Sequence, residues 1–305
     1  IKPVLGEDEI KSDGYIKLNY EENSNILIAK NLYQTEEFEN IVYISSSEKI
    51  KSFTGNKKTF FGKDGIENPS GIHSMRLDND NGLGKKSCIA VEINVEIESF
   101  SDKSISIVMG ADDNIINAKD VAYKYSKIQN CHMELNKIKS YWNELLGRLQ
   151  VKTPYESLNI MLNGWIIYQT IESRLKGKSG FYQSGGAFGF RDQLQDTFSL
   201  KYIDPKILYS QIIRHSKHQF EEGDVEHWWH ENNQRGIRTR FSDDLLWLPY
   251  AVIQYILFTG DYKILDEKTH YIKGEILKEG ENERYDKYLE SDIEETIYEH
   301  CKRAI

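Results

Sequence analysis

The stretch MELNKIKSYWNELLGRLQ, residues 133–150, marks a change in the hydrophobic pattern of the chain. Its apolar residues recur at steps of three and four, which is the spacing of one face of an α-helix. That face comprises Leu135, Ile138, Tyr141, Trp142, Leu145 and Leu149. We predict a helical linker over residues 132–153, followed by a hinge at Pro154, between two domains of different structure.

The pattern before the linker is that of β-strands. In CIAVEINVEIESF, residues 88–100, apolar residues alternate with polar ones up to Ile97. Short apolar runs over residues 26–28, 41–46 and 104–110 indicate further strands, and turns rich in Gly and Asn separate them. The sequence therefore predicts an antiparallel β-sandwich over residues 1–131.

Helical patterns continue after the linker, over residues 154–305. The expected helices cover residues 158–175, 195–203, 204–220, 243–260 and 292–305. Asp204-Pro205 and Ser242-Asp243 are N-cap signals, and Gly260 is a helix stop. Consecutive helices without a strict repeat indicate a helical bundle, a solenoid or an α/α barrel, so the fold class is α+β with several domains.

Charge and composition exclude several kinds of partner. The 305 residues carry a formal net charge of −9 at pH 7, spread along the chain. Nucleic acid is therefore not expected, because phosphate backbones are bound by clustered Lys and Arg. No apolar run reaches the ~20 residues of a membrane span. Cys88, Cys131 and Cys301 lack metal-type spacing, so we expect reduced thiols and a cytoplasmic protein.

The stretch YQSGGAFGFRDQLQD, residues 182–196, places three glycines before a dense polar cluster. Glycine allows positive φ and close approach to a ligand, and the rings and charged groups around it can hold a sugar. We interpret the stretch as one wall of a sugar-binding pocket. The predicted contacts are Tyr182, Arg191, Asp192, Gln195 and Asp196. The alternative is a glycine turn capped by Asp192, with Arg191 and Asp196 paired to each other.

A second polar aromatic segment, residues 221–249, interrupts the helices and is expected to be a loop. His227 and His230 stand three apart, but zinc would need a third protein ligand, so no metal is predicted. In an extended segment Trp228 and Trp229 face opposite ways, so one packs inward and the other can stack on a sugar.

From this second segment we predict Trp229, Arg240 and Asp243 as further substrate contacts. Asp243 and its neighbour Asp244 open the next helix, where carboxylates complement the helix dipole. For these two aspartates the alternative is therefore helix capping.

The sequence resembles glycoside hydrolase family 94, the inverting phosphorylases of β-linked glucosides and chitobiose. The motifs that carry the resemblance are LNGWIIYQTIESRLKGKSGFYQSGGAFGFRDQLQD, residues 162–196, and HWWHENNQRGIRTRFSDDLLWLPYA, residues 227–251. Weaker similarity extends over most of the chain. The second motif is most similar to the β-1,2-glucan branch, which contains oligoglucan phosphorylases and the phosphorylase-like part of cyclic glucan synthases.

This resemblance implies a fold and a reaction. The fold is a β-sandwich, a helical linker and an (α/α)6 barrel. The reaction is reversible phosphorolysis, in which inorganic phosphate, a co-substrate, attacks the anomeric carbon and gives α-glucose 1-phosphate. No other cofactor is implied. The family motif places Arg191, Asp192, Gln195 and Asp196 around the non-reducing glucose, and Asp196→Ala in the whole protein is expected to abolish phosphorolysis.

The family's general acid lies in a Trp-Asn-Asp-Gly motif that this sequence does not contain. We therefore expect the acid beyond Ile305, residues 154–305 to be the first part of a barrel, and this piece alone to be inactive. Two alternatives stay open: the phosphorylase-like domain of a cyclic β-1,2-glucan synthase, and a catalytically silent carbohydrate-binding module. Family members are often dimers, so a homodimer is a further expectation of the resemblance.

Overall fold

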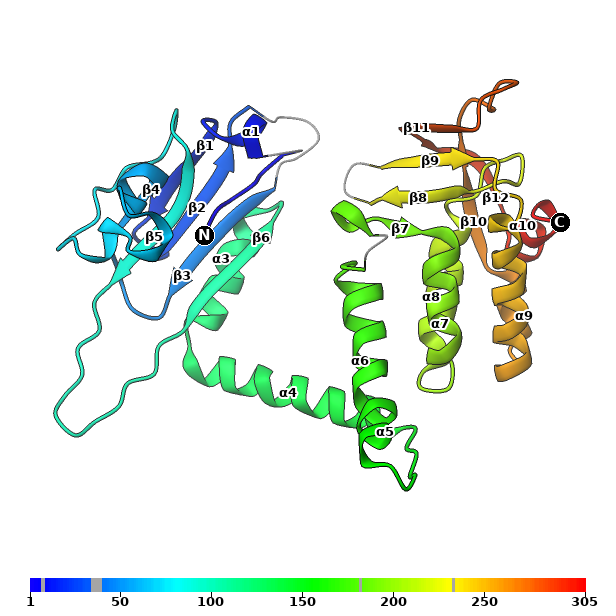
Figure 1. The fold of residues 1–305 in the computed structure, drawn as a ribbon, viewed down its shortest axis with the longest axis horizontal. Helices are drawn as coiled ribbons and strands as arrows, with labels where there is room; N and C mark the ends of the chain where they lie inside the picture. The colour runs from blue at the N-terminus through cyan, green and yellow to red at the C-terminus, as the bar shows by residue number, and fades with distance from the viewer. Residues whose placement is uncertain (7–8, 34–39, 181–182, 232–233) are drawn as a thin grey trace. The chain divides into compact units, whose positions relative to one another are not determined.

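A computed structural model describes residues 1–6, 9–33, 40–180, 183–231 and 234–305 (Figure 1). These residues form two units, Ile1–Ile138 and Lys139–Ile305, which are described separately below. The division falls within helix α4, Ile128–Gly147, where the sequence predicts a helical linker. The predicted apolar face of α4 is largely exposed, and only Leu145 on it is buried.

The N-terminal unit contains two antiparallel sheets. Four strands lie in the order β1-β2-β3-β6, and two further strands, β4 and β5, pair with each other. Their bounds are Ile16–Glu21 for β1, Ile26–Asn31 for β2, Ile41–Ser46 for β3, Ile50–Asn56 for β4, Ser87–Ile93 for β5 and Ile107–Asp112 for β6. Short helices α1, Glu9–Ser12, and α2, Lys57–Phe61, lie outside the sheets. The antiparallel sheets predicted from the sequence are confirmed.

Strand β2 explains how the layers of this unit form. Leu27 and Ala29 point to one face of the sheet, where they share a core with Ile50 of β4 and Ile89 of β5. Residues of the opposite parity, such as Ile28, pack on the other face against helix α3, Ile115–Tyr125. A strand that is buried on both faces therefore has an almost continuous apolar sequence.

The alternating pattern predicts a longer strand than the structure has at β5. The strand ends at Ile93, whereas the apolar alternation continues to Ile97. Residues 94–98 have no ladder partner among the described strands, and Ile97 is 60% exposed. Alternation alone does not make a strand, because the edge also needs a neighbour to pair with.

The C-terminal unit is mainly helical, as predicted. A continuous helical stretch over residues 156–176 joins α5, Glu156–Ile160, to α6, Ile166–Gln169, through π-helical turns. It is followed by α7, Phe190–Leu200, α8, Pro205–Ser216, and α9, Trp247–Thr259. Figure 1 shows α6 to α9 running side by side. The last three pack around one apolar core, centred on residues such as Leu194, Ile212 and Val252.

Two helix boundaries in this unit follow the predicted signals. The carboxylate of Asp204 accepts a hydrogen bond from the Lys206 amide at 3.0 Å and begins α8. Gly260 adopts φ of 70° and ends α9 in a left-handed conformation. Among the described residues, no helix has both the length and the apolar character needed to cross a membrane.

The prediction of a loop over residues 221–249 is wrong, because the segment contains two strands. Strands β8, Glu226–His230, and β9, Arg235–Thr239, form a hairpin in a sheet of order β11-β9-β8-β7. The outer members are β7, Phe188–Gly189, and β11, Glu283–Lys287. Figure 1 shows this sheet lying across one end of α7 and α8.

The helix predicted over residues 292–305 is wrong in its first part. Residues 292–296 belong to strand β12, Leu289–Thr296, which pairs with β10, Lys268–Lys273. The helix α10 begins only at Ile297 and ends at Arg303, and the Thr296 hydroxyl accepts from the Glu299 amide at its start. Pairing with β10 overrides the weak helical pattern of the acidic residues before Thr296.

Candidate functional site

The two segments that the sequence singles out meet in one sheet. Phe188 and Gly189 of β7 pair with Trp229 and Trp228 of β8. Because α7 starts directly after Gly189, this pairing brings the first turn of α7 beside the hairpin of β8 and β9. A site can therefore form from residues that lie about forty positions apart in the sequence.

Gly189 is required by a close contact rather than by its backbone angles. A Cβ at this position would lie 2.4 Å from the Oδ2 atom of Asp192. Its amide donates to the side-chain oxygen of Gln193 at 2.5 Å. The carboxylate of Asp192 thus sits directly over the glycine, where a side chain would displace it.

A cavity of about 520 Å³ opens where these elements meet. It is lined by Arg191, Asp192, His227, Trp228, Phe241, Asp243 and Asp244. The Arg191 guanidinium is 45% exposed and lies 3.7 Å from the Asp192 carboxylate. The cavity therefore combines an aromatic surface with charged donors and acceptors, which is the chemistry that recognises a sugar ring and its hydroxyls.

His227 and Asp244 form the tightest polar contact of this cavity. The Nδ1 atom of His227 lies 2.6 Å from Oδ2 of Asp244, whose carboxylate is almost fully buried. The imidazole ring also packs against Phe241 at 4.7 Å between centroids. This hydrogen bond to Asp244 raises the pKa of His227 above its usual value.

We expect His227 to titrate above about 6.5, the ordinary value for histidine, and Asp244→Asn to lower its pKa. The asparagine removes the negative charge, and the desolvation that opposes imidazolium formation remains. The stabilisation from this pair is present below about pH 6.5 and is lost as the pH rises through the higher folded pKa. NMR titration of the histidine Cε1 protons measures both values. An unchanged His227 pKa in Asp244→Asn would contradict the assignment.

Comparison with known proteins gives the family of this site. Residues 141–305 match the catalytic domain of the glycosyl hydrolase 94 superfamily, and residues 2–128 match the glycosyl hydrolase 94 supersandwich domain. The chain belongs to glycoside hydrolase family 94. The predicted resemblance is confirmed, and so is the order of a sandwich-type domain followed by a helical catalytic domain.

Several relatives in family 94 are similar in sequence to most of this chain. It is 32% identical over 304 residues to the cyclic beta-(1,2)-glucan synthase NdvB of Rhizobium meliloti (strain 1021), covering 99% of this chain and 11% of that protein. It is 24% identical to the N,N'-diacetylchitobiose phosphorylase of Vibrio proteolyticus, covering 90% of this chain and 35% of that protein. It is 21% identical to the solabiose phosphorylase of Paenibacillus borealis, covering 85% of this chain and 33% of that protein. The chain thus spans between about a tenth and a third of these relatives' lengths.

Three of the predicted contacts in this family 94 chain lie together in the cavity: Arg191, Asp192 and Asp243. The side chain of Asp243 makes no capping hydrogen bond to the helical turn that follows it. The predicted alternative of capping therefore does not account for Asp243.

Two predicted contacts, Gln195 and Asp196, lie one turn further along α7 and outside the cavity lining. Gln195 is exposed. The Asp196 carboxylate accepts from Nε of Arg174 at 2.7 Å, so the predicted pairing of Asp196 with Arg191 is wrong. Burial raises the pKa of Asp196, and the ion pair with Arg174 opposes that shift.

The prediction that Trp229 stacks on a sugar is wrong. Trp229 is 1% exposed, and its ring is stacked between Phe188 at 5.5 Å and His218 at 3.8 Å. No ring face remains for a ligand, and its neighbour Trp228 lines the cavity instead.

Arg240 is also placed away from the cavity. Its guanidinium donates to the backbone carbonyl oxygens of Leu277, Lys278 and Glu281 at 2.8–3.0 Å. Arg240 therefore holds the segment before β11, which corrects its predicted role. Tyr182, the remaining predicted contact, lies outside the described residues.

The sequence missed His227 and Trp228 as members of one site. The sequence suggests only a metal ligand at His227, and among the residues described here no group of three His, Cys, Asp or Glu side chains could hold a metal ion. A strand with period two would place these neighbours on opposite faces, and the pairing of β8 with β9 is irregular between Glu226 and Trp228, so no local signal joins His227 and Trp228 in one site.

On strand β8, the buried Glu226 pairs with the half-buried His218. Their Oε2 and Nδ1 atoms lie 2.5 Å apart. Burial raises the pKa of Glu226 and lowers that of His218, so the pair holds a single proton over a wide pH range.

We expect this pair to make the unfolding free energy fall as the pH rises above about 6.5, where the unfolded His218 and Glu226 no longer bind a proton. The folded pair keeps its proton until the raised pKa of Glu226 is passed. Urea denaturation between pH 6 and 9 measures the slope. Glu226→Gln should flatten it, and an unchanged slope in that variant would contradict the shared proton.

Proposed function

We propose that the chain is part of an inverting glycoside phosphorylase, and that the cavity beside α7 binds the non-reducing glucose of a β-linked gluco-oligosaccharide. The observation that carries the proposal is the convergence of Arg191, Asp192 and Trp228 on one cavity of about 520 Å³. A ring face and paired donors and acceptors suit a pyranose. The names of its family 94 relatives, which include several phosphorylases, support the reaction type.

In the proposed reaction, inorganic phosphate attacks the anomeric carbon from the face opposite the leaving sugar. The carbon–oxygen bond to the leaving sugar breaks, a carboxylic acid protonates the departing oxygen, and α-glucose 1-phosphate is released. Phosphate thereby replaces the activated water of an inverting hydrolase. The enzyme needs phosphate as co-substrate and no further cofactor.

None of the three aspartates that line the cavity is proposed as the acid, and Asp192 is proposed to accept from sugar hydroxyls. The Asp244 carboxylate is held by His227, and Asp243 lies next to it at the start of the same helical turn. We propose that the acid, the rest of an (α/α)6 barrel and most phosphate contacts come from residues outside these 305. The three free thiols favour a reducing compartment, the cytoplasm, and a homodimer is proposed from the family.

The β-1,2 linkage is proposed from one relative. Over nearly its whole length, the chain is 32% identical to a protein named cyclic beta-(1,2)-glucan synthase. The same similarity favours a second candidate, a phosphorylase-like domain of such a synthase.

The test incubates the whole protein with inorganic phosphate and a panel of β-1,2-, β-1,3- and β-1,4-linked glucans. We expect release of α-glucose 1-phosphate from the β-1,2 oligomers. Cyclic products from a sugar-nucleotide donor would favour the synthase domain. Sugar binding without any phosphorolysis would indicate a carbohydrate-binding module and would contradict the proposed enzymatic function.

A further inference from the structure

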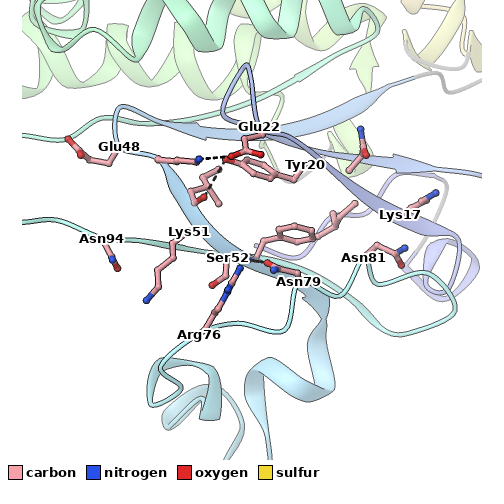
Figure 2. A pocket seen from close by; sticks show the side chains of 15 residues that line it. Lys17, Tyr20, Glu22, Glu48, Lys51, Ser52, Arg76, Asn79, Asn81 and Asn94 are labelled. Carbon is pink, nitrogen blue, oxygen red and sulfur yellow. Dashed lines mark hydrogen bonds and ion pairs between the residues drawn. The ribbon is translucent and has the colours of Figure 1, made fainter.

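One large cavity in the N-terminal unit has no role in the function proposed above. Its volume is about 840 Å³, within the range of about 300–1,000 Å³ typical of small-molecule sites. It opens beside β1 and β4 and is closed on one side by residues 76–81. Figure 2 shows Tyr20 and Glu22 along one wall and Arg76 and Asn79 along the opposite one.

The wall formed by residues 76–81 is built into the backbone of the sheets. The Asn79 amide donates to the carbonyl of Phe53 at 2.8 Å, and the Leu18 amide donates to the carbonyl of Asn81 at 2.9 Å. The segment therefore bridges β4 and β1 as a strap. A wall that is fixed by main-chain bonds on both sides is formed before any ligand arrives.

Two aromatic rings lie between these walls. Tyr20 and Phe53 are each half-buried, with ring centroids 6.1 Å apart at 47°. The Tyr20 hydroxyl donates to the side-chain oxygen of Asn25 at 3.0 Å, which fixes the ring. The cavity thus presents immobilised ring surface at little entropic cost on binding.

The polar groups around the rings are mostly donors that remain available. The side-chain oxygens of Asn79 and Asn81 accept from the Phe53 and Leu83 amides, which leaves both carboxamide nitrogens for a ligand. Within the described part of the chain, Arg76 and Asn94 make no hydrogen bond or ion pair. A hydroxyl-rich ligand can satisfy such donors.

Much of the charge at this cavity is already neutralised. Lys49 pairs with Glu22, Lys51 pairs with Glu92 at 2.7 Å, and Glu48 pairs with Lys103 at 3.0 Å. Lys17 and Arg76 make no ion pair with the described residues, so part of the cationic charge stays unpaired, and the amides and rings beside it suit a ligand rich in hydroxyls. The combination favours a carbohydrate over an inorganic anion.

We propose that this cavity is a second carbohydrate site, which holds a segment of oligosaccharide chain independently of the cavity in the helical unit. The choice of a β-linked glucan as the ligand rests on the function proposed above. Binding by a non-catalytic unit would raise the local concentration of long chains at the enzyme.

The test is calorimetric titration of the 305-residue chain with a β-1,2-gluco-oligosaccharide. The double variant Arg76→Ala/Asn94→Ala removes two exposed side chains that make no hydrogen bond or ion pair with the described residues, so the fold should persist. If the chain has two sugar sites, we expect the double variant to weaken binding at one of them at least tenfold. The matched control, Lys63→Ala/Asn40→Ala, alters two exposed residues of the same unit away from the cavity and should bind as the parent does.

A second variant separates this proposal from the first. Asp192→Ala, in the helical unit, should leave the class of binding that depends on Arg76 unchanged. Loss of both classes in Asp192→Ala, or unchanged binding in Arg76→Ala/Asn94→Ala, would overturn the second site. Displacement of the sugar by millimolar inorganic phosphate in Asp192→Ala would show an anion site and would also overturn it.

Discussion

Trp229→Ala is expected to lower the free energy of unfolding of the helical unit by about 3–5 kcal/mol, the range for deleting a large aromatic side chain from a core. Trp229 is 1% exposed and is stacked between Phe188 and His218. Its edges meet Phe190 and His215. Removal leaves a large cavity where α7, α8 and β8 meet, and few small groups are available to fill it.

Urea denaturation followed by far-UV circular dichroism measures this loss, and hydrogen exchange of α7 amides assigns it to the helical unit. The neighbouring variant Trp228→Ala is the matched control, because the same residue type is removed from the same strand. Trp228 is half-buried and lines the cavity, so its removal should weaken sugar binding with a much smaller loss of stability. A larger destabilisation by Trp228→Ala would reverse our assignment of the two rings.

This pair of residues also marks the limit of what the sequence could predict. An extended segment places adjacent side chains on opposite faces, which correctly separates Trp228 from Trp229. It does not say which face is the core. A one-residue change of register exchanges the two, and the register of β8 depends on its pairing with both β7 and β9, which local sequence does not show.

Elements with strong local signals were predictable. Strand β3 covers Ile41–Ser46, the predicted run, and α8 begins after the predicted cap at Asp204. The hairpin of β8 and β9 was not, because its strands lack an alternating apolar pattern, although two Asn residues separate them in the sequence. Its pairing comes from tertiary contacts with β7 and β11.

The candidate site was predictable in residue type and only partly in position. Arg191 and Asp192 from the first polar segment and Asp243 from the second line the cavity. Asp196 lies in the first segment but is paired with Arg174, twenty-two residues earlier. A partner at that distance along the chain follows from the packing of helices and is not visible in local sequence.

Asp192→Asn is expected to weaken binding of a β-linked gluco-oligosaccharide by about 10- to 100-fold, the range for losing a hydrogen bond to a charged group. Asp192 lines the cavity, and its nearest charged neighbour, Arg191, lies 3.7 Å away. The carboxylate is therefore available to accept from sugar hydroxyls. Calorimetry on the 305-residue chain measures the affinity, and phosphorolysis by the whole protein should fall with it.

Gly189→Ala tests the role of the Asp192 carboxylate by changing its position, whereas Asp192→Asn changes its charge. The new Cβ would lie 2.4 Å from Oδ2 of Asp192, so the carboxylate must move while its charge remains. We expect a loss of affinity similar to that of Asp192→Asn. Gln195→Ala, an exposed change one turn away on α7, is the control and should bind nearly as the parent does. If Gly189→Ala and Asp192→Asn both bind sugar normally while Gln195→Ala does not, the ligand lies further along the helix, and the cavity beside Trp228 is not the sugar site.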